Sequence, residues 1–170
     1  MEAKERPVEC FIGGYRNDRI DPVLSQQGLC HGLVVFAIPS LGIMFKCRAE
    51  GDSVELEFGA FFSLLKFIKT KLAEEKIASV RVFSSNPQFV FAFTGNSRYM
   101  APGSTRQKLL KEYAGNMQIA VGYVEPYKNK TIISPADYPS LPVGQKSTLI
   151  PDLNESKKAE FRPFQRGVKL

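Results

Sequence analysis

The longest uninterrupted apolar run in this chain extends from Leu33 to Ile38, with Gly32 before it and Pro39 after it. Its short length and its β-branched residues favour a strand buried on both faces, because a strand with one wet face alternates apolar and polar residues. The run is far shorter than the ~20 residues that a membrane-spanning helix needs. We therefore expect a soluble protein built around a β-sheet.

Two more strands are predicted directly after this run. Residues 42–50 turn to an alternation of apolar and polar side chains, which is typical of a strand with one wet face. Gly51-Asp52 is a strong hairpin-turn sequence, and residues 54–58 alternate again. The pattern predicts three strands in a meander.

The hydrophobic period then changes. Apolar residues recur at helical spacing through residues 61–72, with lysines and glutamates between and after them, which predicts an amphipathic helix of about four to five turns. The elements expected after it are a strand, a short helix, a helix and a strand, at residues 78–83, 88–93, 104–113 and 118–124. The aromatic and β-branched content of the short helix leaves a strand open there, whereas Ser104 and Gln107 have the spacing of a capping box.

Composition narrows the class of protein. A chain of 170 residues with 44% apolar residues is enough for one average domain. The first residues, MEAKERP, carry charges without an apolar core after them, so we expect no secretory signal and a cytoplasmic protein. Cys10, Cys30 and Cys47 lack the spacing of a disulfide framework or a zinc site, and Cys30 next to His31 would need partners from elsewhere. We expect buried, reduced thiols.

The order of these elements implies a mixed sheet with helices packed against it. This order resembles the ribonuclease H-like fold, and three local segments support the resemblance. Residues 57–65 are similar to the family's glutamate at the end of the third strand, which opens a helix rich in Ala and Leu. Residues 80–90 resemble its fourth strand and the turn after it, and residues 118–124, with Asn129 after them, resemble its fifth strand. The expected fold class is α/β, with a five-stranded mixed sheet, flanking helices and an extended C-terminal tail.

The resemblance implies a site in which four carboxylates hold two divalent cations that cut a phosphodiester. The first-strand aspartate would fall near Ile38, where no acid is present, and the third-strand glutamate matches Glu57. The fourth-strand aspartate falls at the uncharged Ser85 or Asn86, and the last acid could only be Asp137. At most two of the four acids remain, so the resemblance implies a site without catalysis.

The two remaining acids, Glu57 and Asp137, are the candidate metal ligands. For Glu57 we favour a plainer role, as a partly exposed acid at a helix N-terminus where the helix dipole stabilises its charge. We accordingly expect no catalytic residue and no cofactor.

Composition changes again towards the C-terminus, where four of the eleven prolines fall between Ser134 and Pro151 and periodicity disappears. We expect an N-terminal extension at residues 1–31, a ribonuclease H-like domain at 32–137 and a proline-containing basic tail at 138–170. Such a tail becomes ordered only where a partner surface offsets the entropy cost.

Three functions are compatible with this sequence. The first is a non-catalytic module that acts by protein–protein interaction or self-association. The second is nucleic-acid binding without cleavage, because the net charge is +6 and the sequence pI is about 9.3. The residues that would contact nucleic acid are Lys66, Lys69, Lys71, Arg106, Lys108, Lys111, Arg162 and Arg166.

The third function is a phosphodiester hydrolase with a rearranged, Mg²⁺-dependent site. In this hypothesis Glu55 and Glu57 share one strand face by the two-residue period and join Asp52 or Asp137 around the metal. None of the three functions involves a membrane.

Overall fold

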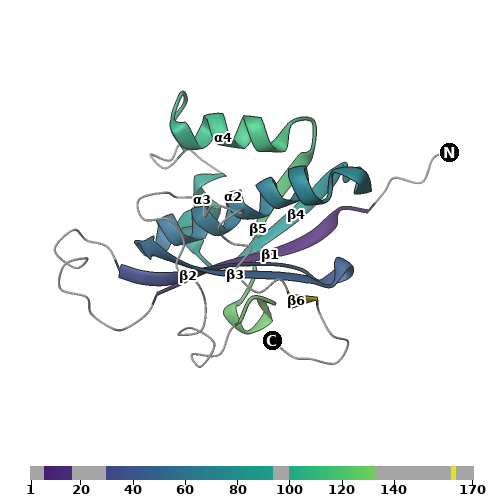
Figure 1. Cartoon of the computed structure of the whole chain (residues 1–170). Helices are drawn as coiled ribbons and strands as arrows, with labels where there is room; N and C mark the ends of the chain where they lie inside the picture. Colours follow the sequence, from purple (N-terminus) through teal and green to yellow (C-terminus); the bar gives the residue numbers. More distant parts are fainter. Residues whose placement is uncertain (1–5, 17–29, 94–99, 133–161, 164–170) are drawn as a thin grey trace.

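The centre of the fold is a mixed β-sheet, taken from a computed structural model that describes residues 6–16, 30–93, 100–132 and 162–163. Its strands are β1 (Val8–Arg16), β2 (Cys30–Ile38), β3 (Ile43–Gly51), β4 (Ser79–Ser84), β5 (Gln118–Tyr123) and the two-residue β6 (Arg162–Pro163). They lie in the order β5-β4-β1-β2-β3-β6 (Figure 1). The pairs β1–β2, β2–β3 and β3–β6 are antiparallel, whereas β4 pairs in parallel with both β1 and β5.

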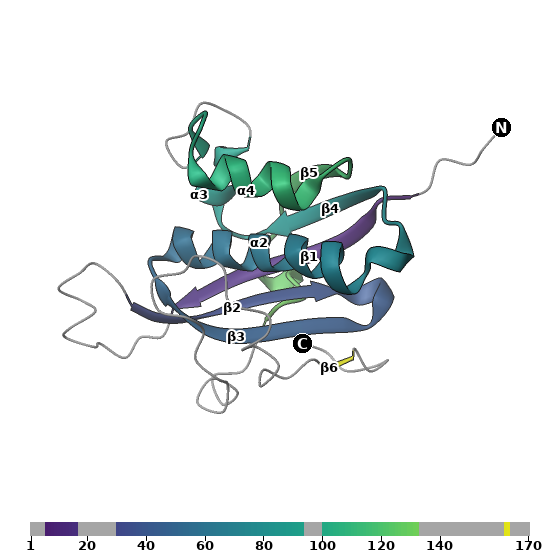
Figure 2. The same cartoon turned by 45° about the horizontal axis from the view of Figure 1, so that its top comes forward.

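The α-helices of the described chain all lie on one face of this sheet (Figure 2). They are α2 (Ser53–Lys71), α3 (Pro87–Ala92) and α4 (Thr105–Ala114), with 3-10 turns at Pro39–Leu41, Ala73–Glu75 and Pro126–Lys128. Helix α2 packs against β1 and β2, and α4 packs on α2. None of these helices is long and apolar enough to cross a membrane.

The expected start of the domain at residue 32 is wrong, because β1 is a central strand of the sheet. It pairs with β2 from Phe11 to Arg16 and with β4 from Val8 to Phe11. The first strand of the fold is therefore β1, and the apolar run that suggested a first strand is the second. Glycines and turn residues hid β1 in the sequence, since it contains Gly13-Gly14 and charged ends.

The prediction that the apolar run is buried on both faces is confirmed. Every residue of β2 from Leu33 to Ile38 is at most 1% exposed. Alternate residues contribute to two clusters, with Val34 and Phe36 on the helix face and Leu33 and Val35 on the other. A strand between two apolar layers has no wet face, so its sequence does not alternate.

The prediction of a strand at residues 54–58 is wrong, because these residues form the first turns of α2. Asp52 is the N-cap, and its Oδ1 accepts a hydrogen bond from the Glu55 amide at 2.8 Å. The alternation in the sequence misleads because this helix is buried around most of its circumference between the sheet and the other helices. Leu56, Glu57 and Phe58 are all at most 3% exposed, so no polar stripe marks the helical period here.

The predicted helix is confirmed as α2 but begins at Ser53, before the apolar stripe from which it was predicted. The strands β3, β4 and β5 and the helices α3 and α4 are confirmed at or within two residues of the predicted positions. The short helix α3 begins after Asn86, whose Oδ1 accepts from the amides of Gln88 and Phe89. In α4, Ser104 Oγ accepts from the Gln107 amide at 3.2 Å. These caps satisfy amides that have no partner within the helix.

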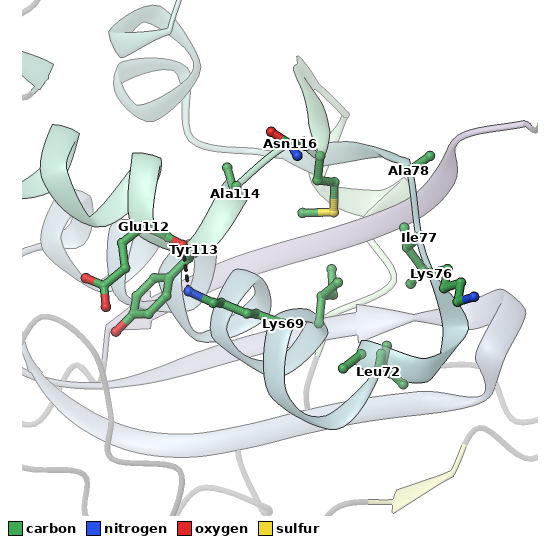
Figure 3. Close-up of a pocket in the computed structure, with 13 residues that line it drawn as sticks. Lys69, Leu72, Lys76, Ile77, Ala78, Glu112, Tyr113, Ala114 and Asn116 are labelled. Atoms are coloured by element: carbon green, nitrogen blue, oxygen red, sulfur yellow. Dashed lines mark hydrogen bonds between the residues drawn. The ribbon is translucent and has the colours of Figure 1, made fainter.

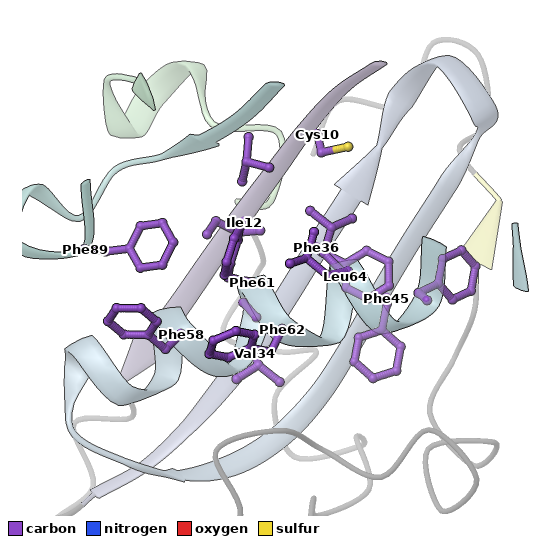
Figure 4. Close-up of a cluster of buried hydrophobic side chains, with 14 of the residues drawn as sticks. Cys10, Ile12, Val34, Phe36, Phe45, Phe58, Phe61, Phe62, Leu64 and Phe89 are labelled. Carbon is purple, nitrogen blue, oxygen red and sulfur yellow. The ribbon is translucent and has the colours of Figure 1, made fainter. Parts of the chain in front are cut away.

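Phenylalanines fill the space between the sheet and the helices (Figure 4). Phe58 and Phe61 of α2 contact Phe89 of α3 edge-to-face, with ring centroids 4.9 and 5.3 Å apart. Cys10 and Cys47 are buried and not disulfide-bonded, as expected, and burial raises the pKa of the Cys10 thiol to about 12. The core thus fixes α2 firmly against β1 and β2.

Candidate functional site

The carboxyl group of Glu57 in α2 lies where this helix meets β1 and β4. Glu57 is 3% exposed, and both of its carboxyl oxygens accept hydrogen bonds. Gly14 N–H donates to Oε2 at 2.6 Å, and Ser84 Oγ donates to Oε1 at 2.5 Å. The expectation of a partly exposed acid is therefore wrong, because the first turn of α2 lies against the sheet instead of in solvent.

Gly14 allows α2 to approach β1 this closely. A Cβ atom at this position would lie 2.6 Å from the Glu57 nitrogen and 2.7 Å from the Leu56 carbonyl carbon. Both are backbone atoms of the helix, which cannot move aside as a flexible side chain can. The glycine thus places its own amide within hydrogen-bonding distance of the Glu57 carboxyl group.

The end of β4 adds hydroxyl and amide groups to the surroundings of Glu57. We call Glu57 and the residues of β1, of the end of β4 and of the segment after β5 that surround it the buried corner. Ser84 Oγ, besides its bond to Glu57, accepts from the Asn86 amide at 3.1 Å. Ser85 Oγ donates to the Val124 carbonyl at the end of β5, at 2.7 Å. These residues are neutral, as the sequence showed for the fourth-strand position.

A second group of hydrogen bonds continues from Ser85 to the far end of β1. Asn129 Nδ2 donates to Ser85 Oγ at 3.1 Å and to the Ile12 carbonyl at 3.0 Å. Thr131 Oγ1 donates to Asn129 Oδ1 at 2.7 Å, and its oxygen lies 2.6 Å from the Tyr15 hydroxyl. Asn129 and Thr131 are both buried, so this network ties the chain after β5 to β1.

Burial determines the protonation of this corner. It raises the pKa of Glu57 to about 7, against the hydrogen bonds from Ser84 and Gly14, which lower it. Burial also raises the pKa of Tyr15 to about 12; the hydrogen bond with Thr131 opposes this rise, and the negative charge of Glu57 adds to it. Near neutral pH Glu57 is therefore present in both its neutral and its ionised form.

The donor set at this corner does not fit a pair of divalent cations. Magnesium binds through clustered oxygen ligands with negative charge, and among the described residues one carboxyl group lies here, surrounded by hydroxyls, amides and carbonyls. In the described part of the chain no group of three or more His, Cys, Asp or Glu residues could hold a metal ion. Asp137, the other candidate ligand, lies outside the described residues.

The expected position of the first-strand acid at Ile38 is wrong, since Ile38 ends β2. The strand that reaches Glu57 is β1, and it carries Gly13 and Gly14 at this level. The prediction that Glu55 and Glu57 share a strand face is also wrong, because residues two apart on a helix point in different directions. Burial and the charge of Asp52 raise the pKa of Glu55, which lies outside the buried corner.

The predicted basic residues are spread over two helices and β6. Lys69 and Lys71 at the end of α2 and Lys108 and Lys111 on α4 are exposed, whereas Lys66 is half-buried. Lys69 Nζ donates to the Glu112 carbonyl of α4 at 2.8 Å. The Arg106 guanidinium carbon lies 4.3 Å from the Phe58 ring centroid, so this side chain packs between the helices. Arg162 is on β6, and Arg166 lies outside the described residues.

A pocket of about 470 Å³ opens away from this corner, between the C-terminal ends of α2 and α4 (Figure 3). Its apolar lining includes Ile68, Leu72, Ile77 and Met117. Lys69 and Glu112, joined by the hydrogen bond drawn in Figure 3, form part of its wall. No local sequence pattern predicts this pocket, because its walls come from two segments, 68–78 and 112–117, that lie far apart in the sequence.

The sequence also contains few signals for the neutral members of the corner. Two adjacent glycines such as Gly13-Gly14 are by themselves typical of a bend. In the sequence Asn129 only follows the predicted fifth strand, and nothing distinguishes Tyr15 or Thr131. A glycine pair flanked by apolar residues is the one signal that could have suggested a close backbone approach.

The strand order, the mixed pairing and the helices on the sheet give this chain a ribonuclease H-like α/β fold. Among solved structures, the chain is similar to the N-terminal ribonuclease H domain of a Mycobacterium tuberculosis protein, with 13% identity, a TM-score of 0.49, and 72% of this chain and 86% of that chain covered. It is similar to a ribonuclease H1 from the halophilic archaeon Halobacterium salinarum, with 8% identity, a TM-score of 0.47, and 74% and 91% covered.

A third similar structure is LC11-RNase H1, solved in complex with an RNA/DNA hybrid, with 15% identity, a TM-score of 0.48, and 71% and 87% of the two chains covered. No protein-family model and no curated protein matches this sequence.

Proposed function

We propose that this chain is a non-catalytic ribonuclease H-like module that acts by binding another protein or a second copy of itself. The observation that carries the proposal is the state of Glu57. Its two oxygens are occupied by Gly14 and Ser84, it is buried, and its neighbours on β1 and β4 are uncharged. A hydroxyl or amide oxygen cannot replace the negative charge that would hold two metal ions.

The absence of hydrolysis is tested directly with a labelled RNA/DNA hybrid in Mg²⁺ and separately in Mn²⁺. We expect no cleavage above a buffer blank over a range in which a ribonuclease H positive control cuts the hybrid completely. Titration of Mg²⁺ followed by calorimetry should show no saturable binding. Metal-dependent cleavage that disappears in Glu57→Gln would overturn the proposal.

A second candidate function is nucleic-acid binding without cleavage, and one observation favours it. Helices α2 and α4 lie side by side, so exposed lysines of both helices share one layer of the molecule. These residues are Lys69, Lys71, Lys108 and Lys111. Exposed lysines on neighbouring helices can contact successive phosphates of one strand.

This candidate predicts an effect of reversing the charge of Lys108 and Lys111, which are exposed and not part of the α2–α4 contact made by Lys69. The Lys108→Glu, Lys111→Glu double variant should weaken binding to single-stranded DNA at least about tenfold. It should also make the dependence of log affinity on log salt less steep, by about 0.7 for each lost phosphate contact. Fluorescence polarisation at several salt concentrations measures both quantities.

The matched control reverses the same charge at Lys128 and Lys130, which are exposed at the 3-10 turn after β5 (Figure 1). That turn lies on the opposite side of the sheet from α4, so affinity should change little. Equal losses in both double variants would mean that net charge alone, and no helix surface, attracts the nucleic acid.

A further inference from the structure

The two edges of the sheet differ in the described part of the chain. Beyond β3 the sheet continues into β6, which pairs with Ile43 and Met44. Beyond β5 no further strand is present among the described residues. An edge strand that pairs on one side only presents backbone N–H and C=O groups to any extended segment that approaches it.

Strand β5 lacks the features with which edge strands usually prevent such pairing. Residues 113–124, from before β5 to one residue past its end, contain no charged residue and no proline. Gln118, Ala120 and Tyr123 are exposed, and Tyr123 is 46% exposed. In a chain with a net charge of +6, this uncharged edge is where two copies can meet without like charges opposing each other.

The two ends of β5 also differ in a way that suits pairing with a second copy: one end carries an exposed aromatic side chain, and the other lies at a pocket. Ile119 and Val121 belong to the cluster on the helix face, so the two-residue period places Tyr123 on that face as well. Met117, just before the strand, is on the same face and lines the pocket between α2 and α4. An exposed aromatic residue thus lies near one end of the edge, and a pocket with apolar walls lies at the other.

We propose that two copies of this chain pair through β5, antiparallel and about a two-fold axis, to form one continuous sheet. With Ala120 opposite Ala120 of the second copy, Tyr123 comes opposite Met117. The exposed ring of each copy then lies at the pocket of the other, and the contact occurs twice by symmetry. The proposal names the partner for the interaction part of the proposed function and does not depend on whether the chain cleaves nucleic acid.

The oligomeric state of the full chain tests this proposal. Sedimentation equilibrium should give a concentration-dependent mass that approaches twice the 19.0 kDa of one chain. Ala120→Glu should raise the dissociation constant of the dimer at least about tenfold, because it places two like charges opposite each other at the centre of the interface. Ala120 is exposed, so circular dichroism should show an unchanged fold.

The register is tested by mixing oppositely charged variants. Ala120→Glu and Ala120→Lys should each be mainly monomeric alone and should form a heterodimer together, since the charges then attract. The matched control is Leu41→Glu, which places a charge on a 40%-exposed apolar residue at the turn between β2 and β3 and should not affect the mass.

A wild-type chain that stays monomeric at all concentrations, or an Ala120→Glu variant that dimerises as well as wild type, would overturn the β5 pairing. Either outcome leaves the proposal of a non-catalytic module intact, because that proposal is judged by the cleavage and metal-binding measurements.

Discussion

The free energy of unfolding of the wild-type protein is expected to fall by about 3 kcal/mol as pH rises from about 4.5 to about 7, and Glu57→Gln is expected to abolish this fall. The carboxyl group is buried and has its pKa raised from 4.5 to about 7, and each tenfold change in an acid dissociation constant corresponds to about 1.36 kcal/mol. Glutamine has nearly the same shape and does not ionise. The measurement is the free energy of unfolding in urea at a series of pH values.

The free energy of unfolding falls with pH because the folded chain binds the Glu57 carboxyl proton more tightly than the unfolded chain does. Below about pH 4.5 Glu57 is protonated in both the folded and the unfolded chain, so its burial carries no ionisation cost. Between 4.5 and 7 the unfolded chain loses this proton and the folded chain keeps it, so stability decreases as pH rises. Above about pH 7 both states are ionised, and the loss is complete.

The matched control is Glu75→Gln, which removes an exposed carboxyl group from the 3-10 turn after α2. It should retain the wild-type pH dependence. If Glu57→Gln retains it as well, the slope comes from other groups and the buried carboxyl group does not ionise in this pH range.

Gly14→Ala is expected to destabilise the fold by about 3 kcal/mol. The added methyl group would lie within 2.7 Å of backbone and Cβ atoms of Leu56 and Glu57, so α2 must move away from β1. This movement would also break the hydrogen bond from the Gly14 amide to Glu57. Thermal and urea unfolding of the variant measure the loss.

Gly122→Ala is the matched control, because it adds the same methyl group in the same sheet. Its nearest neighbour would be the Phe83 ring at 3.8 Å, an ordinary contact distance. Its stability should change by less than about 0.5 kcal/mol. A Gly14→Ala variant as stable as Gly122→Ala would mean that α2 is not held tightly against β1.

Short stretches of sequence correctly predict some elements of this structure. The apolar run of β2 indicated a strand between two layers, and Ser104 with Gln107 located the start of α4. Such signals work because periodicity and capping depend on residues within a few positions of one another. The same local patterns failed at residues 54–58, where burial on most sides of α2 removed the contrast between faces that identifies a helix.

The buried corner shows why the candidate site could be predicted only in part. The sequence indicated that most of the carboxylates expected from the resemblance are missing, because that requires only their identity. It did not indicate that Glu57 is buried or that Gly14 contacts it, since these residues are 43 positions apart. Tyr15 and Thr131 are 116 positions apart, and no local pattern connects them.

The order of local patterns and the identities of a few residues were therefore enough to predict the class of fold and the shortage of negative charge at the expected site. Which segment is the first strand depends on tertiary contacts, because β1 is held in the sheet by pairing with β2 on one side and β4 on the other. Tertiary contacts also decide the state of Glu57, because the pKa of a carboxyl group depends on its burial and its hydrogen-bond partners. Both are set by segments that meet only when the sheet has formed.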